Sequence, residues 1–152
     1  MNTNILCVGK LKEPYLKQAQ AEYLKRLAPF TKTKITEVAE EGILDESKQK
    51  DIVLSKEGAR LLKSLTPFKM PAFSLCIDGK GLTSLSFAEL IKNHPKICFI
   101  IGGSHGIHEK VTSLGGRISL SPLTFPHQLA RIILLEQIYR AHKILKGGKY
   151  HK

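Results

Sequence analysis

A pair of glycines, Gly102 and Gly103, directly follows an apolar run at residues 97–101. Glycine has no Cβ, so the backbone of such a turn can approach a ligand closely. In an open α/β sheet, ligands bind beyond the carboxyl ends of strands, which is where this pair is expected. For an isolated glycine pair, a plain strand-to-helix turn has equal weight.

Residues 119–131 read SLSPLTFPHQLAR and are the second stretch that could hold a ligand. Two prolines stiffen the segment, and a loop rarely leaves side chains such as Leu120, Leu123 and Phe125 in solvent. Backbone N–H and C=O groups of a rigid loop can bind the polar edge of an adenine, while apolar side chains cover the ring. We therefore expect this loop to pack around a ligand.

Several other chemistries lack the residues that they need. His105 and His108 have HxxH spacing, but Asp, Glu and Cys are sparse nearby, so a solvated pair is favoured over a metal site. Cys7, Cys76 and Cys98 are far apart and follow no CxxC pattern, which favours reduced, buried thiols. The GxGxxG, GxxxxGK[ST] and GxSxG patterns are absent. We expect no metal site and no disulfide.

The positive charge lies near the two ends of the chain. The net charge of the 152 residues is +11. Residues 1–35 hold seven Lys and Arg against two Glu, residues 101–152 hold eight against two, and the middle holds nine of each sign. A concentrated positive field favours a polyanionic partner, because Lys and Arg release the counterions that condense on phosphates. A solvated basic surface without a partner is the less favoured alternative.

The cytoplasm is the expected compartment. No apolar run approaches the roughly 18 residues of a membrane span. The N-terminus lacks the charged region and the small-residue cleavage site of a signal peptide. We therefore expect no membrane partner.

Strands and helices are predicted to alternate and to position these residues. Apolar and alternating runs predict strands at residues 5–8, 34–38, 73–77, 97–101 and 117–120. Helical spacing and capping residues predict helices at residues 14–27, 52–65, 87–92 (capped by Ser86), 109–114 and 127–145. Residues 40–50 are expected to form a surface loop, and residues 78–81 a turn. This order predicts one α/β domain, residues 1–152, with a mainly parallel sheet flanked by helices.

The final predicted helix, residues 127–145, carries apolar residues around most of its circumference. One core needs an apolar stripe of only about 100°. A domain of this size has few places to bury such a helix completely, so we expect a homodimer interface.

Five motifs resemble, in order and spacing, those of the small SPOUT, or α/β-knot, methyltransferases, and specifically the RlmH family, which methylates N3 of a pseudouridine in 23S ribosomal RNA. They are VGKLK at 8–12, IGGSHG at 101–106, LTFPHQLAR at 123–131, EQIYRA at 136–141 and YHK at 150–152. The match runs from end to end, and the five together are specific although each alone is weak. The resemblance implies a trefoil-knotted chain, an obligate dimer, S-adenosylmethionine as cofactor and ribosomal RNA as substrate.

The resemblance also assigns residues. Carried over position by position, the cofactor contacts fall on Leu75, Gly103, Leu120, Ser121, Pro122, Leu123, Thr124 and Phe125. Pro122 departs from the small or flexible residue that is frequent in relatives. In the family the tail closes over the site, which makes Tyr150 and His151 candidates for substrate binding or proton removal. Arg131, Arg140 and Lys152 would contact phosphates or bases.

Methyl transfer to a ring nitrogen needs no metal, so the protein must position the reactants and remove the imide proton. His127 starts the final helix beside the presumed adenine loop, and histidine titrates near pH 6.5. A capping or structural role for His127 has equal weight, and a glycine-hinged tail such as residues 147–152 is usually disordered.

Two alternatives remain open. A SPOUT enzyme acting on transfer RNA would explain everything except the family-specific tail. A non-catalytic RNA-binding protein would explain the basic ends but would leave the loop at residues 120–125 without a role.

Overall fold

Strands and helices alternate in the computed structural model, which describes residues 1–42, 50–67 and 69–152. Within these ranges the elements are β1 (Asn2–Val8), α1 (Pro14–Leu27), β2 (Lys32–Val38), α2 (Lys50–Leu65), β3 (Ala72–Gly81), α3 (Ser84–Asn93), β4 (Lys96–Ile101), α4 (Glu109–Thr112), β5 (Gly116–Ser119) and α5 (His127–Leu145). The surface loop predicted at residues 40–50 falls, at positions 43–49, outside the described residues.

The described strands form one parallel sheet in the order β2-β1-β4-β3-β5, which confirms the predicted α/β class. Strand β1 lies between β2 and β4, and Cys7 stands opposite Ile101 in the pairing of β1 with β4. Because the strands are parallel, the residues that follow β1 and β4 meet at one edge of the sheet. The turn at Gly102 and Gly103 is therefore placed next to Gly9.

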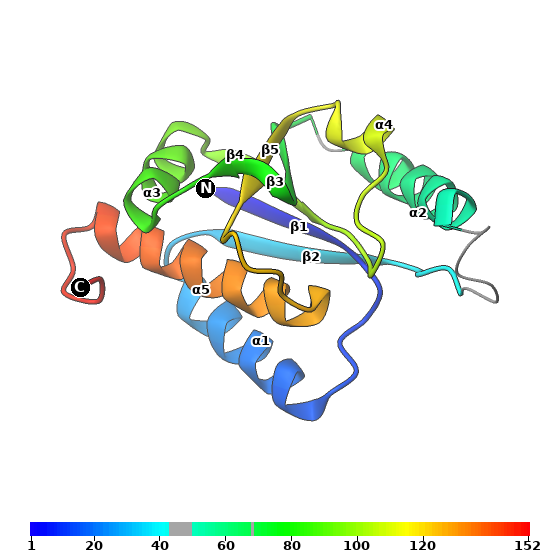
Figure 1. The fold of residues 1–152 in the computed structure, drawn as a ribbon. Helices are drawn as coiled ribbons and strands as arrows, with labels where there is room; N and C mark the ends of the chain where they lie inside the picture. Colours follow the sequence, from blue (N-terminus) through cyan, green and yellow to red (C-terminus); the bar gives the residue numbers. More distant parts are fainter. Residues whose placement is uncertain (43–49, 68) are drawn as a thin grey trace.

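Helices cover both faces of the sheet, which explains why its central strands are almost continuously apolar. Successive side chains of a strand point to opposite faces. Ile5, Cys7, Ile97, Phe99 and Ile101 pack with α1, α3 and α5, whereas Leu6, Val8, Cys98 and Ile100 pack with α2 and α4. Figure 1 shows α1 and α5 side by side beneath the sheet and α2 and α4 above it.

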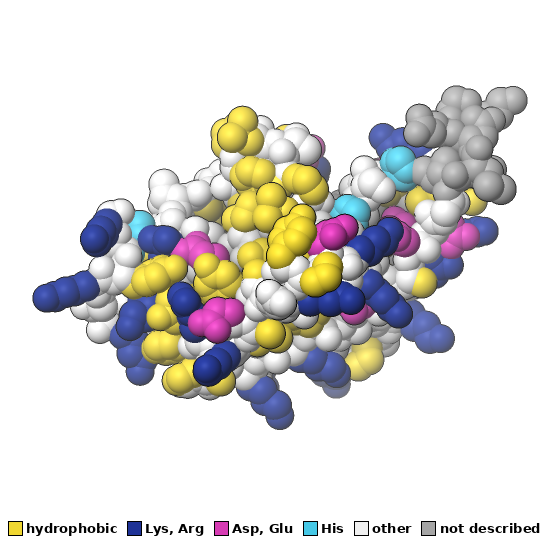
Figure 2. Space-filling model, turned by 90° about the horizontal axis from the view of Figure 1, so that it is seen from below, with side chains coloured by type: hydrophobic (Ala, Val, Ile, Leu, Met, Phe, Trp, Pro, Cys, Tyr) yellow, Lys and Arg dark blue, Asp and Glu magenta, His cyan; other side chains and the backbone are white. Residues whose placement is uncertain are grey.

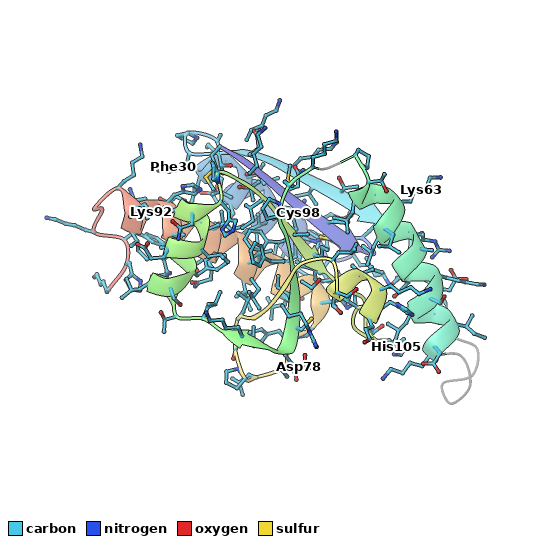
Figure 3. The ribbon with its side chains drawn as sticks, turned by 90° about the horizontal axis from the view of Figure 1, so that it is seen from above. Phe30, Lys63, Asp78, Lys92, Cys98 and His105 are labelled. Atoms are coloured by element: carbon cyan, nitrogen blue, oxygen red, sulfur yellow. The ribbon has the colours of Figure 1, made fainter. Side chains whose placement is uncertain are left out.

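The cysteines are free, and two of the three are buried as predicted. Burial raises the pKa of the Cys7 thiol to about 11 and that of Cys98 to about 12, so both stay protonated near neutral pH. Figure 3 places Cys98 inside the molecule. Cys76 is half-buried, contrary to the prediction, because it belongs to a part of β3 that arches away from the sheet.

Two local predictions were wrong. Residues 78–81 do not form a turn, because β3 continues to Gly81 through a register shift in which Leu75 and Lys80 both stand opposite Ile118. The N-cap of α3 is Thr83 rather than Ser86, and the two residues form a reciprocal capping box. The first error depends on pairing within the sheet, whereas the second is a local choice between two hydroxyl residues three positions apart.

Helix α5 is buried along one side and partly open along another. Leu134, Leu135 and Ile138 are fully buried in the core beneath the sheet. Leu129 remains 41% exposed, and Leu123, just before the helix, is 71% exposed. Figure 2 views this face of the molecule and shows hydrophobic side chains gathered at its centre, with Lys and Arg around them. Among the described helices, none is both long and apolar enough to cross a membrane.

Candidate active site

A pocket of about 1210 Å³ lies where β3, β4 and β5 end. Its position follows from the parallel sheet, whose strand-to-helix connections gather at one edge. Most of the predicted cofactor residues line it, namely Leu75, Gly103, Leu120, Ser121, Leu123, Thr124 and Phe125. Pro122 is exposed and is not among the lining residues.

The glycine turn after β4 forms one wall of the pocket. Gly106 has a φ of 87°, and its N–H donates a 3.1 Å hydrogen bond to the Gly103 carbonyl. A side chain at Gly102 would collide with the Gly106 carbonyl. A Cβ at Gly103 would lie 3.2 Å from Val8 Cγ1 and 3.3 Å from Glu57 Oε1. A side chain at position 103 would therefore fit only if Val8 of β1 and Glu57 of α2 moved by a few tenths of an ångström.

The loop after β5 is held in shape by two hydrogen bonds at Ser121. Ser119 Oγ donates to the Ser121 carbonyl at 2.9 Å, and Ser121 Oγ accepts from the Leu123 N–H at the same distance. These bonds fix the backbone between strand and helix while leaving Leu123 and Thr124 exposed at the pocket. The predicted rigidity therefore has a physical cause beyond the two prolines.

The opposite wall comes from the arched part of β3, which the sequence interpretation missed. Cys76, Ile77 and Asp78 line the pocket, and Asp78 accepts a 2.6 Å hydrogen bond from Arg117 of β5. A Cβ at Gly79 would lie 2.7 Å from the backbone of Ile118, so glycine permits this close approach. Asp78 and His105 both line the pocket and lie on one side of the molecule in Figure 3.

His127 lines the pocket at the first position of α5, as predicted. Its Nε2 would lie 3.9 Å from a Cβ at Gly9, whose φ is 87°. The turn after β1 is also joined to α5 by a 2.9 Å hydrogen bond from the Lys12 N–H to Gln128 Oε1. The imidazole therefore sits where β1 and α5 meet at the pocket.

Arg131 is enclosed in the protein, with a side chain 2% exposed. Its guanidinium forms a 2.8 Å ion pair with Glu37 and donates to the Gly9 carbonyl at 3.1 Å and to Gln20 at 3.2 Å. Arg131 does not line the pocket. In this structure it joins α5 to β2 and to the turn after β1.

The tail lies at the other end of α5 from His127. Tyr150 contacts Glu136, and Arg140 contacts Glu136, Tyr150 and His151. At 1.5 Å per residue, Arg140 is about 20 Å from His127 along the helix axis. Figure 1 shows the C-terminus beyond the end of α5, away from the side where β1 ends. Arg140, Tyr150, His151 and Lys152 are thus not part of the pocket of their own chain.

No group of three or more His, Cys, Asp and Glu in the described part of the chain could hold a metal ion. The ring of His108 instead caps α4, since its Nδ1 accepts a 3.0 Å hydrogen bond from the Lys110 N–H. The sequence interpretation also missed Glu57, which is 4% exposed beside Gly103. The burial of Glu57 could have been predicted from its position, because it lies four residues after Val53 and four before Leu61 on the buried face of α2.

Comparison with known proteins agrees with this architecture. The family model described as "Predicted SPOUT methyltransferase" matches residues 1–151. The chain is 43% identical to "Ribosomal RNA large subunit methyltransferase H" of Bacillus pumilus (strain SAFR-032) over 160 residues, and 45% identical to the protein of the same name of Clostridium botulinum (strain Kyoto / Type A2) over 162 residues. Both matches cover 100% of each chain.

Among solved structures, the fold is similar to "Crystal structure of TrmJ from Z. mobilis ZM4", with a TM-score of 0.54 and 13% identity. That match covers 93% of this chain and 70% of the other, and at this identity it concerns the fold alone. The full-length family match, together with the two relatives above 40% identity, establishes that the chain belongs to the SPOUT methyltransferase family.

Proposed function

We propose that the protein uses S-adenosylmethionine to methylate N3 of a pseudouridine in 23S ribosomal RNA, on the ribosome or its large subunit. The observation that carries this proposal is the end-to-end similarity to two relatives named as large-subunit ribosomal RNA methyltransferases. The basic ends of the chain suit an RNA substrate. Residues 1–152 act in this proposal as a single cytoplasmic methyltransferase domain, with the trefoil knot that the family resemblance implies.

The residues of the pocket fit S-adenosylmethionine. Pockets for small molecules usually measure roughly 300–1,000 Å³, so about 1210 Å³ leaves room for part of a target nucleotide beside the cofactor. Leu75, Leu120 and Phe125 offer apolar surface for an adenine, and the backbone around Ser121 is held rigid beside them. Pro122 would stiffen this loop without touching the cofactor.

When bound, the cofactor would supply an electrophilic methyl group. The protein must then orient the pyrimidine ring and accept its N3 proton, since a neutral imide nitrogen is a poor nucleophile. His127 is the candidate base within the pocket of the same chain. It lies beside the turn after β1, where the rigid junction with α5 would fix the direction of its ring.

We further propose that the protein acts as a homodimer in which the tail of one chain completes the pocket of the other. Within one chain, Tyr150 and His151 are held at the opposite end of α5, so they cannot reach their own pocket in this arrangement. The exposed Leu123, just before α5, and Leu129, in its first turn, offer an apolar surface for a second copy. Arg140 and Lys152 would then contact the RNA beside the partner's pocket, and Arg131 would support it from within.

The test is mass mapping of 23S ribosomal RNA from a strain that lacks the protein. The proposal expects the loss of one methyl group from a pseudouridine, and its return when the gene is restored. If a methyl group is missing from transfer RNA instead, a SPOUT enzyme that acts on transfer RNA is favoured. Unchanged RNA of both kinds would favour a non-catalytic RNA-binding role.

A further inference from the structure

Glu57 is an acidic side chain buried next to the pocket. It belongs to α2, where Val53 and Leu61 flank it on the buried face. Its Oε2 accepts a 3.0 Å hydrogen bond from the Glu41 N–H. Its Oε1 is fully buried and has no hydrogen-bond partner among the described residues. A buried carboxylate oxygen without a partner is energetically costly, so a functional reason for its presence is to be considered.

Glu57 lies directly behind the glycine wall of the pocket. A Cβ at Gly103 would lie 3.3 Å from Glu57 Oε1 and 3.5 Å from Oε2. Gly103 itself lines the pocket. Because residue 103 has no side chain, the carboxylate of Glu57 lies close to the backbone of a residue that lines the pocket. A buried charge is screened less by solvent and salt than an exposed one.

The two cations of α2 nearest to Glu57 in sequence pair with other groups. Arg60 pairs instead with Glu41 at 2.5 Å and with the Ala39 carbonyl at 2.9 Å, and Lys56 also pairs with Glu41. Burial raises the pKa of Glu57, the nearby charge of Glu40 raises it further, and His105 and Arg60 oppose these effects. A cation arriving in the pocket would favour the charged form of this carboxyl group.

We propose that Glu57 is a specificity-determining residue that makes the pocket prefer the positively charged sulfonium cofactor to its neutral thioether product. This inference rests on the proposed function. In the reaction the carbon–sulfur bond breaks and its electron pair stays on sulfur, while the methyl group bonds to the ring nitrogen and the displaced proton passes to a base. The charge on sulfur, one unit, is therefore present before transfer and absent afterwards. Glu57 acts through the Gly103 backbone and touches no reacting atom.

The charge preference has a second consequence, which is linked proton release. A cation that favours ionised Glu57 must displace its proton to the extent that the carboxyl group was protonated beforehand. Binding of S-adenosylmethionine should therefore release protons, and the amount should rise as the pH is lowered toward the carboxyl range. S-adenosylhomocysteine, whose sulfur is neutral, should release fewer.

Calorimetry of the full-length protein with both compounds tests this inference. The affinity of each compound is measured for wild-type protein and for Glu57→Gln in two buffers with different ionisation enthalpies. The measurements run from about pH 5 to about pH 7, above the ordinary glutamate pKa of about 4.3. We expect the preference for the sulfonium over the thioether to fall about tenfold in Glu57→Gln, which corresponds to one pKa unit of differential interaction. Its proton release should disappear. Glu89→Gln, an exposed carboxylate of α3, is the matched control and should behave as wild type.

The outcomes separate the two proposals. If folded wild-type protein binds neither compound, the proposed function fails. If it binds both and Glu57→Gln keeps the same preference and proton release, this inference alone is overturned. If Glu57→Gln does not fold, the measurements on wild-type protein still test the inference. Equal proton release on binding of the two compounds would contradict a role for the charge on sulfur.

Discussion

The hydroxyl of Tyr150 donates a 3.1 Å hydrogen bond to Oε1 of Glu136, which ties the tail to the helix that precedes it. Arg140 reinforces the contact, since its guanidinium pairs with Glu136 at 2.6 Å and lies 4.8 Å from the centre of the Tyr150 ring. Tyr139 packs edge-on against the same ring. The tail is therefore ordered by specific contacts, and its distance from its own pocket makes action on a second chain the simplest way for it to take part in catalysis.

Deleting Tyr150–Lys152 should abolish RNA methylation and leave the fold and the proposed dimer intact. The core of α5, around Leu134 and Ile138, does not involve the tail. Circular dichroism and light scattering would check the fold and the mass of the assembly, and methyl incorporation would report activity. Full activity of the truncated dimer on ribosomes would remove the tail from the mechanism and leave His127 as the remaining candidate base.

Mixed dimers should show whether the tail acts between chains. One subunit carries the tail deletion, and the other carries Thr124→Trp, which adds a large ring at a residue that lines the pocket and is a predicted cofactor contact. Each homodimer should be inactive, whereas the mixture should recover activity, because one intact pocket then meets one intact tail. No recovery would contradict action between chains. Lys152→Ala serves as a milder variant, and it should weaken RNA binding and lower the salt slope by about one.

Replacing Gly103 by Val should destabilise the protein by about 1–3 kcal/mol, the usual effect of overpacking. The added carbon atoms would push against Val8 and Glu57, which lie 3.2 and 3.3 Å from the Cβ position. Gly81→Val is the control, because nothing lies within 4 Å of a Cβ there. Urea unfolding measures both variants. Equal stability of the two would contradict the packing explanation for Gly103.

The glycine turn illustrates how far the sequence could predict the site. The position of Gly102 and Gly103 after a buried strand correctly predicted that they line a pocket. The structure adds a second reason for glycine at position 103, since Glu57 of α2 and Val8 of β1 lie close to its Cβ position. The close approach of a ligand stays a prediction. Local spacing predicts which residues lie at a strand end, but contacts between distant elements decide what each residue touches.

Arg131 and the arched part of β3 show the same limit. Helical spacing placed Arg131 on α5, and its burial against Glu37 depends on the pairing of β1 with β2, more than ninety positions away in sequence. Residues 78–81 contain the polar and glycine residues of a turn, yet Lys80 and Gly81 pair with Ile118 and Ser119 of β5 after the register shift. The elements themselves were predicted well because the apolar periodicity of helices such as α1 and α2 is clear, and because α5 is a long segment rich in apolar residues.

Arg131→Met should lower the free energy of unfolding by about 2–3 kcal/mol, because hydrogen bonds to charged groups contribute in this range when buried. The variant loses the contacts to Glu37 and to the Gly9 carbonyl while keeping most of the side-chain volume. Arg26→Met removes an exposed ion pair with Glu22 and should change stability by less than about 1 kcal/mol. Chemical denaturation compares the two variants. Similar decreases in the free energy of unfolding would show that the buried contacts of Arg131 do not stabilise the fold more than an exposed ion pair does.

Stability should fall in acid partly through His142. Its side chain is 6% exposed, Nε2 has no hydrogen-bond partner among the described residues, and the ring stacks on Phe30. Burial lowers the pKa of His142, and the N-terminal amine and Lys146 lower it further. The unfolded chain therefore takes up the proton first, near pH 6.5, so the stabilisation is present above that pH and is lost as the pH falls through the lower folded value.

Unfolding by urea between about pH 5 and about pH 8, on either side of the ordinary histidine pKa, measures this effect. Wild-type protein should lose more stability on acidification than His142→Gln, whose side chain does not titrate. Parallel stability curves for the two proteins would exclude His142 as the source of the acid sensitivity.

Transfer of a labelled methyl group from S-adenosylmethionine by the purified protein tests the central claim most directly. Ribosomes, free large subunits and transfer RNA are offered separately in the presence of a chelator, and the product is mapped by mass spectrometry. The account predicts one methyl group on N3 of a pseudouridine in 23S ribosomal RNA, formed without added metal. Methylation confined to transfer RNA, or no transfer by folded protein that binds the cofactor, would contradict it.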